Sequence, residues 1–367
     1  MDLTAPTSLS DVIADGALVQ AGVDEAWRRE FGQVTGVEFS GDEVRVHRRD
    51  QAAVDLPGRQ VAVIRGGEWT WEPAWPGVPD IAELHGSHPA DDQLVAAART
   101  LHGNVPVLLA PSGELTRVIA VGFRPSPGPV RDSLIAGLAG MPEGVDVERS
   151  LLGFAASRGL GIRREEDAVS FSDGTALTLV DGRVTHVSGG LSLAQVRADA
   201  RYLSFEHQLL LVGRFPDAIV RVNIGRGTAM VADRVQATAV IIATITGDSW
   251  TWAWADPHLP PTAAANLRRF GLDQGIPELF RPSVPVDRAR HLALEEVAKP
   301  VLGIWTHAVT RLNDTTSAVV LLDAPELHLP APTEETVAAT LQAPLDPALD
   351  RDRALAAYRS RRGITTG

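Results

Sequence analysis

The sequence predicts an α+β protein built as a tandem duplication, in which each copy is a mostly antiparallel sheet covered by helices on one face. Three landmarks recur in the same order in both halves and carry this prediction. They are Leu9-Ser10 and Leu191-Ser192, then Trp69-Thr-Trp71 and Trp250-Thr-Trp252, then Glu148-Arg149-Ser150-Leu151 and Asp352-Arg353-Ala354-Leu355. We therefore expect an N-terminal copy over 1–161, a hairpin linker over 162–189 and a C-terminal copy over 190–367.

Each copy is expected to run through the same elements in the same order. The first copy predicts a helix over 10–31, strands over 36–40, 43–48 and 60–65 that continue into the Trp segment, a helix over 91–102, strands over 105–110 and 115–123, and helices over 130–139 and 147–158. The second predicts a helix over 192–212, strands over 218–224, 228–233 and 237–245, a helix over 286–299, strands over 301–311 and 317–322, and helices over 333–342 and 351–361.

Capping residues support these boundaries. Ser192 begins a capping box that Gln195 completes three residues later. Aspartates at N-cap positions and glycines at left-handed C-cap positions delimit the last helix of each copy: Asp146, Asp350, Gly159 and Gly363. The linker carries two turn dipeptides, Asp173-Gly174 and Asp181-Gly182, so we expect it to fold as hairpins.

The tryptophans of the second copy are the most distinctive local pattern. Trp250, Trp252 and Trp254 alternate, so an extended strand would place all three indoles on one face. One interpretation is a layer of the core, and the other is an aromatic groove that binds a ligand. The groove interpretation names its candidate ligand-binding residues as Trp250, Trp252, Trp254, Asp256, Trp71 and Trp75. Pro73 interrupts the alternation in the first copy, which favours the second copy as the groove.

The second copy resembles an uncharacterised bacterial family, domain of unknown function 6882. The resemblance rests on a Trp-x-Trp-x-Trp-Ala-Asn/Asp-Pro signature, which here runs from Trp250 to Pro257, and on the later Phe270-Gly271. The first copy departs from the signature after Trp71. The resemblance implies an α+β domain in a bacterial protein, and it carries over no activity and no functional residue.

Composition excludes several classes of function. The formal net charge of −12 disfavours nucleic acid and anionic membranes as partners. The chain has no cysteine, which excludes disulfides, thiolate metal sites and a cysteine nucleophile. Lys299 is the only lysine, so lysine chemistry is confined to that position. The acidic N-terminal residues lack the pattern of a signal peptide, and we expect a cytoplasmic protein.

Few residues are candidates for catalysis or metal binding. His85 and His88 lie near Asp91 and are the candidates for a metal site, but a loop with Gly and Pro fixes no common face, so we predict no metal and no cofactor. His291 and Glu295 would share one face of the helix over 286–299 as a surface pair. Ser192 is explained by its capping role, and we predict no catalytic residue.

These observations favour a non-catalytic binding or interaction protein that holds a protein partner or a small ligand. An enzyme with a dispersed site is the first alternative, with His85, His88, Asp256 or His258 as polar participants. An immunity-type protein or a structural scaffold is the second.

Overall fold

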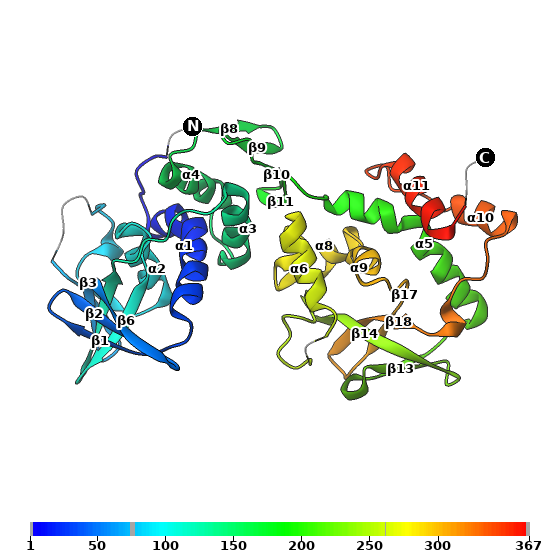
Figure 1. Cartoon of the computed structure of the whole chain (residues 1–367), viewed down its shortest axis with the longest axis horizontal. Coiled ribbons are helices and arrows are strands. Elements are labelled where there is room, and N and C mark those ends of the chain that lie inside the picture. The colour runs from blue at the N-terminus through cyan, green and yellow to red at the C-terminus, as the bar shows by residue number, and fades with distance from the viewer. Residues whose placement is uncertain (1–2, 74–77, 261, 365–367) are drawn as a thin grey trace. The chain divides into compact units, whose positions relative to one another are not determined.

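The computed structural model describes residues 3–73, 78–260 and 262–364. The chain divides into two compact units, residues 1–188 and 189–367. Both units are α+β and contain antiparallel sheets, as the sequence predicted (Figure 1). Each helix in the described ranges is too short or too polar to cross a lipid bilayer.

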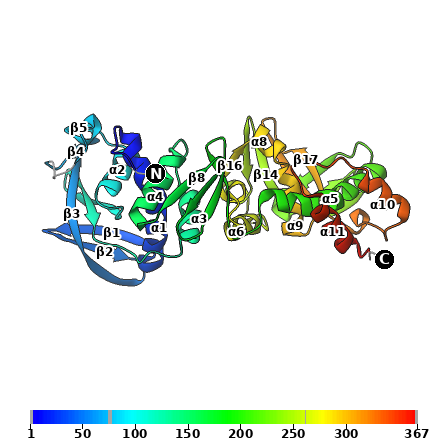
Figure 2. The same cartoon turned by 90° about the horizontal axis from the view of Figure 1, so that it is seen from above.

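The first unit begins with a long helix and continues through a seven-stranded sheet. Its elements are α1 (Leu9–Phe31), β1 (Val34–Ser40), β2 (Glu43–Arg48), β3 (Gln51–Arg65), β4 (Glu68–Trp71), β5 (Ser87–Pro89), α2 (Asp92–Leu101), β6 (Val107–Ser112), β7 (Leu115–Val121), α3 (Val130–Gly140) and α4 (Val147–Arg158). The strand order is β1-β2-β3-β4-β5, and β7 pairs with both β3 and β6. Helices α1 and α2 lie against one face of this sheet (Figures 1 and 2).

The predicted linker residues form a small sheet of their own within the first unit. Its strands are β8 (Ile162–Glu165), β9 (Ala168–Phe171), β10 (Ala176–Val180) and β11 (Arg183–Val187). They pair in sequence order, and two of the connecting turns contain Gly174 and Gly182 at positive φ. The turn dipeptides therefore fold as hairpins, because glycine adopts the left-handed conformation without steric cost.

The second unit repeats this order of strands and adds two helices before its fifth strand and one after it. Its elements are α5 (Leu193–Arg214), β12 (Val220–Asn223), β13 (Thr228–Val231), β14 (Val235–Thr246), β15 (Ser249–Trp252), α6 (Ala265–Gln274), α7 (Pro277–Phe280), β16 (Ser283–Pro285), α8 (Val286–His291), α9 (Leu294–Leu302), β17 (Thr306–Arg311), β18 (Thr316–Asp323), α10 (Glu334–Leu341) and α11 (Arg351–Arg362). The strand order is β12-β13-β14-β15-β16, and β18 pairs with both β14 and β17.

The two large sheets agree even in an irregularity of register. The pairing of β3 with β7 shifts between Gln60 and Ala62, and the pairing of β14 with β18 shifts between Ile241 and Ala243. A β-bulge at the same place in two sheets is a specific feature, because each bulge adds one unpaired residue at a fixed position. This shared register identifies which residues of the two units correspond.

Two expectations about the strands and helices were wrong in detail. The Trp segment does not extend the preceding strand but returns as a separate antiparallel strand, because turns at Gly66-Gly67 and Gly247 reverse the chain. The helix expected over 286–299 is two helices, α8 and α9, because Ala293 adopts a left-handed φ of 47° between them. A left-handed residue cannot continue a right-handed helix.

Candidate functional site

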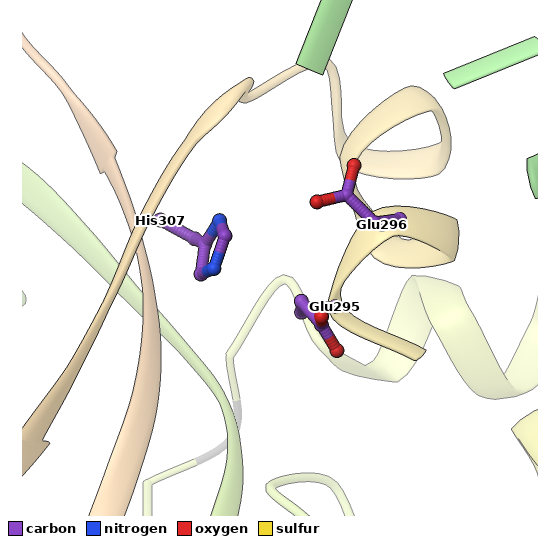
Figure 3. Close-up of side chains that lie close together, drawn as sticks. All are labelled: Glu295, Glu296 and His307. Carbon is purple, nitrogen blue, oxygen red and sulfur yellow. The ribbon is translucent and has the colours of Figure 1, made fainter. Parts of the chain in front are cut away.

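Three side chains that can bind a metal ion, two carboxylates and one imidazole, converge in the second unit. Glu295 and Glu296 lie in the first turn of α9, and His307 is the second residue of β17. Figure 3 shows His307 pointing from its strand toward the helix that carries both glutamates. One potential ligand atom from each of the three lies within 4.8 Å of the others. Within the described ranges this is the one group of three such side chains that converges.

The break between α8 and α9 positions the two glutamates. Because Ala293 turns the chain, α9 starts in a new direction and its first turn faces β17. His291 ends α8 and is exposed, whereas Glu295 is partly buried on the next helix. The predicted surface pair of His291 and Glu295 is therefore wrong, since the two residues do not share a helix. A left-handed alanine stores about 1 kcal/mol of strain, which is common beside functional sites.

Lys299 is a buried neighbour of the cluster and forms an ion pair with Glu296. Its side chain is 0% exposed, and its Nζ lies 3.0 Å from Glu296 Oε1. Nζ also donates a hydrogen bond to Ser204 Oγ on α5. Burial lowers the pKa of Lys299, and the nearby Glu296 carboxylate partly opposes that shift. Ser204 is 1% exposed, so this hydroxyl–amine pair has no solvent-facing atom with which to meet a substrate.

Burial also sets the charge of the other members. It lowers the pKa of His307 to about 4, so the imidazole is neutral at pH 7. A neutral imidazole is the form that binds a metal ion. Burial raises the pKa of Glu295, and the adjacent Glu296 carboxylate raises it further. The Gln208 side-chain amide donates to the His307 carbonyl at 3.1 Å and also contacts His307 Nδ1, which holds the ring in place.

One carboxylate oxygen in the cluster has no partner. Glu296 Oε2 is buried and accepts no hydrogen bond from the described residues. The side chain as a whole is 18% exposed, but this oxygen has almost no contact with solvent. An unpaired buried carboxylate oxygen is costly, and a bound cation would satisfy it.

The first unit shows that the fold does not require polar side chains at these positions. At the bulge Ile119 pairs with Gln60 and Val320 pairs with Ile241, so Ile119 corresponds to Val320. The residues that follow them, Ala120 and Leu321, pair with Val107 of β6 and His307 of β17, so Val107 corresponds to His307. The buried residues of the two helices match in the same way, with Leu94, Ala97 and Ala98 corresponding to Leu294, Val297 and Ala298. Glu295 and Glu296 therefore correspond to Val95 and Ala96. Val95 and Val107 pack against the core of the first unit.

The tryptophans predicted to line a groove are mostly core residues. Trp250 is 3% exposed, Trp252 is 0% and Trp71 is 7%. The Nε1 of Trp252 donates to the Glu278 carbonyl at 2.8 Å, and the Nε1 of Trp71 donates to the Glu83 carbonyl at 2.9 Å. The core interpretation of the alternating pattern therefore accounts for these three rings. Trp75 lies outside the described residues.

Trp254 and Asp256 lie beyond the end of the strand. β15 ends at Trp252, so the predicted single face of three indoles is wrong for Trp254, which sits in the following turn. The Trp254 ring is partly exposed, and the Arg268 guanidinium stands 5.3 Å from its centroid. The Asp256 carboxylate accepts from Thr244 Oγ1 at 2.8 Å and from the His258 backbone N–H at 2.9 Å. These bonds give Asp256 a role in closing the turn.

The histidines first considered for a metal site bind backbone carbonyls instead. His88 Nε2 lies 2.7 Å from the His85 carbonyl, and His85 Nε2 lies 3.2 Å from the Pro79 carbonyl. The sequence did not identify Glu295, Glu296 and His307 as a group, because no known motif spacing joins the start of a helix at Leu294 to a strand that begins at Thr306. The sole lysine of the chain was the available signal, since Lys299 anchors the group.

The comparisons with known proteins bear on this segment. Residues 194–325 match a family of unknown function (DUF6882). The DUF6882 segment contains Ser204, Gln208, Glu295, Glu296, Lys299 and His307. No curated protein and no solved structure matches the chain significantly.

Proposed function

We propose that this chain is a non-catalytic binding protein and that its DUF6882 segment holds a divalent metal ion between Glu295, Glu296 and His307. The observation that carries the proposal is the convergence of these three side chains within 4.8 Å where the first unit has apolar residues. Side chains that the fold does not need, yet that are partly buried and converge, are characteristic of a binding site.

The ligand set selects a class of metal. One imidazole and two carboxylates suit Zn²⁺, Mn²⁺, Fe²⁺ or Ni²⁺, whereas Ca²⁺ and Mg²⁺ prefer sites made of oxygen alone. Three protein ligands leave coordination positions for water or for a group from a partner. Lys299 acts as the internal counter-ion of Glu296, and a metal ion would take over that role at the second carboxylate oxygen.

Calorimetric titration and thermal unfolding of the full chain with Zn²⁺, Mn²⁺, Mg²⁺ and Ca²⁺ test the proposal. We expect Zn²⁺ or Mn²⁺ to bind and to raise the unfolding temperature of the second unit, because a ligand at one hundred times its Kd contributes about 2.7 kcal/mol. His307→Val places the first-unit residue type in the cluster, and Glu296→Ala does the same when Lys299→Met is added to remove the unpaired charge, so both should keep the fold and abolish binding.

His328→Val is the matched control. His328 is exposed and pairs with Asp323 at 2.8 Å, and neither residue is a member of the cluster. The control should bind metal as tightly as the unmodified chain. If none of the four cations binds, or if the His307→Val variant binds as well as the control, the cluster is not a metal site.

A further inference from the structure

A pocket of about 500 Å³ opens in the first unit, and none of its lining residues belongs to the cluster described above. It lies among α1, α3, α4 and the loop before α3. Its apolar wall includes the buried residues Leu18, Val23 and Phe154. Its lining also includes three arginines, Arg29, Arg124 and Arg158. A pocket of this size with an apolar wall and a few polar groups is typical of a small-molecule site.

The helices that form this pocket have counterparts in the second unit. Ser8 and Ser192 begin α1 and α5 with the same capping box. Arg149 of α4 binds Asp15 of α1, and Arg353 of α11 binds Asp199 of α5. Arg158 and Arg362 each precede a left-handed C-cap glycine. Counting from these landmarks pairs Gly22 with Glu206, Phe154 with Tyr358, and Arg158 with Arg362.

In the second unit, Glu206 and Arg362 form a buried ion pair, and Tyr358 contacts the same carboxylate. Glu206 is 6% exposed, and its Oε2 lies 3.0 Å from Arg362 Nε. Arg362 Nη2 donates to Glu206 Oε1 at 3.1 Å. The Tyr358 hydroxyl donates to Glu206 Oε2, also at 3.1 Å. The carboxylate thus accepts hydrogen bonds from two donors of α11 and lies in ion-pair contact with the same arginine, an arrangement in which a buried charge is compensated.

In the first unit, the arginine remains and the carboxylate is missing. A Cβ atom built on Gly22 would meet nothing within 4 Å, so a side chain at this position would start in open space beside the pocket. Arg158 donates to the Gly128 carbonyl and reaches Ser133 Oγ at 3.5 Å, and no carboxylate of the described residues pairs with it. Gly22 and Arg158 both line the pocket.

We propose that this pocket binds a small organic carboxylate, whose carboxyl group takes the place that Glu206 holds in the second unit. Arg158 supplies the fork of N–H donors that matches a carboxylate, and the apolar wall receives the rest of the molecule. Arg29 and Arg124 add two further positive charges, and neither has an ion-pair partner among the described residues.

The acidic side chains around the pocket do not neutralise it. Glu25 is engaged by Arg28 at 2.9 Å, and Asp132 is exposed in the first turn of α3. The pocket therefore has more positive than negative side chains, although the chain as a whole is acidic. A local excess of positive charge concentrates small anions from solution.

The first experiment tests, without any ligand, whether a carboxylate placed at position 22 pairs with Arg158 as Glu206 pairs with Arg362. Thermal unfolding is measured for Gly22→Glu and Gly22→Ala, each with Arg158 and with Arg158→Leu. The alanine is the matched control, because it adds only a Cβ in open space. With Arg158 present, we expect G22E to unfold at a higher temperature than G22A. With Arg158→Leu, we expect the order to reverse, because the new carboxylate is then buried without a partner. The same order in both backgrounds would overturn the correspondence.

The second experiment tests the ligand class with octanoate as the probe. Calorimetry on the full chain should show octanoate binding to the unmodified protein and to G22A with similar affinity. G22E and R158L should bind it at least about tenfold more weakly, because each removes the charge match. 1-Octanol should also bind at least about tenfold more weakly, since it lacks the charge.

Three results would contradict the ligand class. They are the absence of octanoate binding at millimolar concentration, equal binding of octanoate and 1-octanol, and tighter binding of octyl phosphate than of octanoate. Neither experiment involves the metal cluster of the second unit, so failure here and failure of the proposed metal site are separate outcomes.

Discussion

Lys299 and Arg99 occupy corresponding positions on α9 and α2, and the two side chains use different partners. Arg99 reaches across to Asp24 of α1, with Nη2 and Oδ1 2.5 Å apart. Lys299 instead pairs with Glu296 of its own helix, because Gln208 stands where Asp24 would be and contacts His307. The basic residue at this position thus links two helices in the first unit, whereas in the second unit it neutralises a carboxylate of the polar cluster. This difference concerns individual charges, and the backbone order stays the same.

Removing the lysine should therefore lower the free energy of unfolding, because Glu296 loses its counter-ion. Lys299→Met leaves the Glu296 carboxylate partly buried without its counter-ion, and we expect a loss of up to about 3 kcal/mol in the free energy of unfolding. Lys299→Met combined with Glu296→Ala removes both charges and should recover most of that loss. Urea unfolding of the metal-free protein measures both. A double variant as unstable as the single one would show that the pair is not the source of the effect.

The short Trp strands β4 and β15 illustrate what a sequence pattern predicts at the level of an element. Alternation predicted an extended strand and left open whether its indoles form a core layer or a groove, and Trp250 and Trp252 lie on such a strand and are buried. The pattern could not show where the strand ends, because Trp254 continues the alternation through the following turn. It also could not separate a returning strand from a continuous one, since that depends on the left-handed turn at Gly247.

Trp252 and Trp254 should consequently differ in their effect on stability. Trp252→Phe removes a buried ring portion and leaves the Glu278 carbonyl without its indole donor, which we expect to cost about 2–4 kcal/mol. Trp254→Phe should cost under about 1 kcal/mol, because its ring is partly exposed and its contact with Arg268 survives with phenylalanine. Urea unfolding followed by circular dichroism compares them. Equal costs would contradict the assignment of Trp252 to the core and Trp254 to the rim.

At the level of the whole molecule, two units share a topology and differ in buried charge. Repeated landmarks in the sequence predicted the shared topology, because caps and strand patterns are local signals. They could not predict the cluster of Glu295, Glu296 and His307, which depends on how α9 approaches β17. They also could not predict the pocket beside Gly22, since the hydrophobic periodicity of a sequence does not show where side chains leave a space unfilled.

Acid should destabilise both units through buried histidines. Burial lowers the pKa of His102 in the first unit, and of His207 and His307 in the second, to about 4 in each case. In the unfolded chain these rings titrate near their usual pKa of about 6.5, so the unfolded state binds more protons between the two values. The contribution to stability is therefore present above pH 6.5 and is lost as the pH falls toward 4.

We expect the free energy of unfolding to fall by up to about 1 kcal/mol per pH unit for His307 within that window. Urea unfolding between pH 7 and pH 4.5 measures the slope. His307→Val should flatten the slope for the second unit. Parallel profiles for His307→Val and the unmodified chain would contradict the burial of a neutral imidazole at this position.

Lys299 has one more consequence, which concerns chemistry performed on the protein from outside. It is the only side-chain amine in this sequence, and it is 0% exposed in the folded second unit. Acetyltransferases, ubiquitin ligases and amine-directed cross-linkers therefore have no accessible lysine in the folded chain. The rate of acylation at Lys299 would therefore measure how often the second unit opens, and it would not respond to unfolding confined to the first unit.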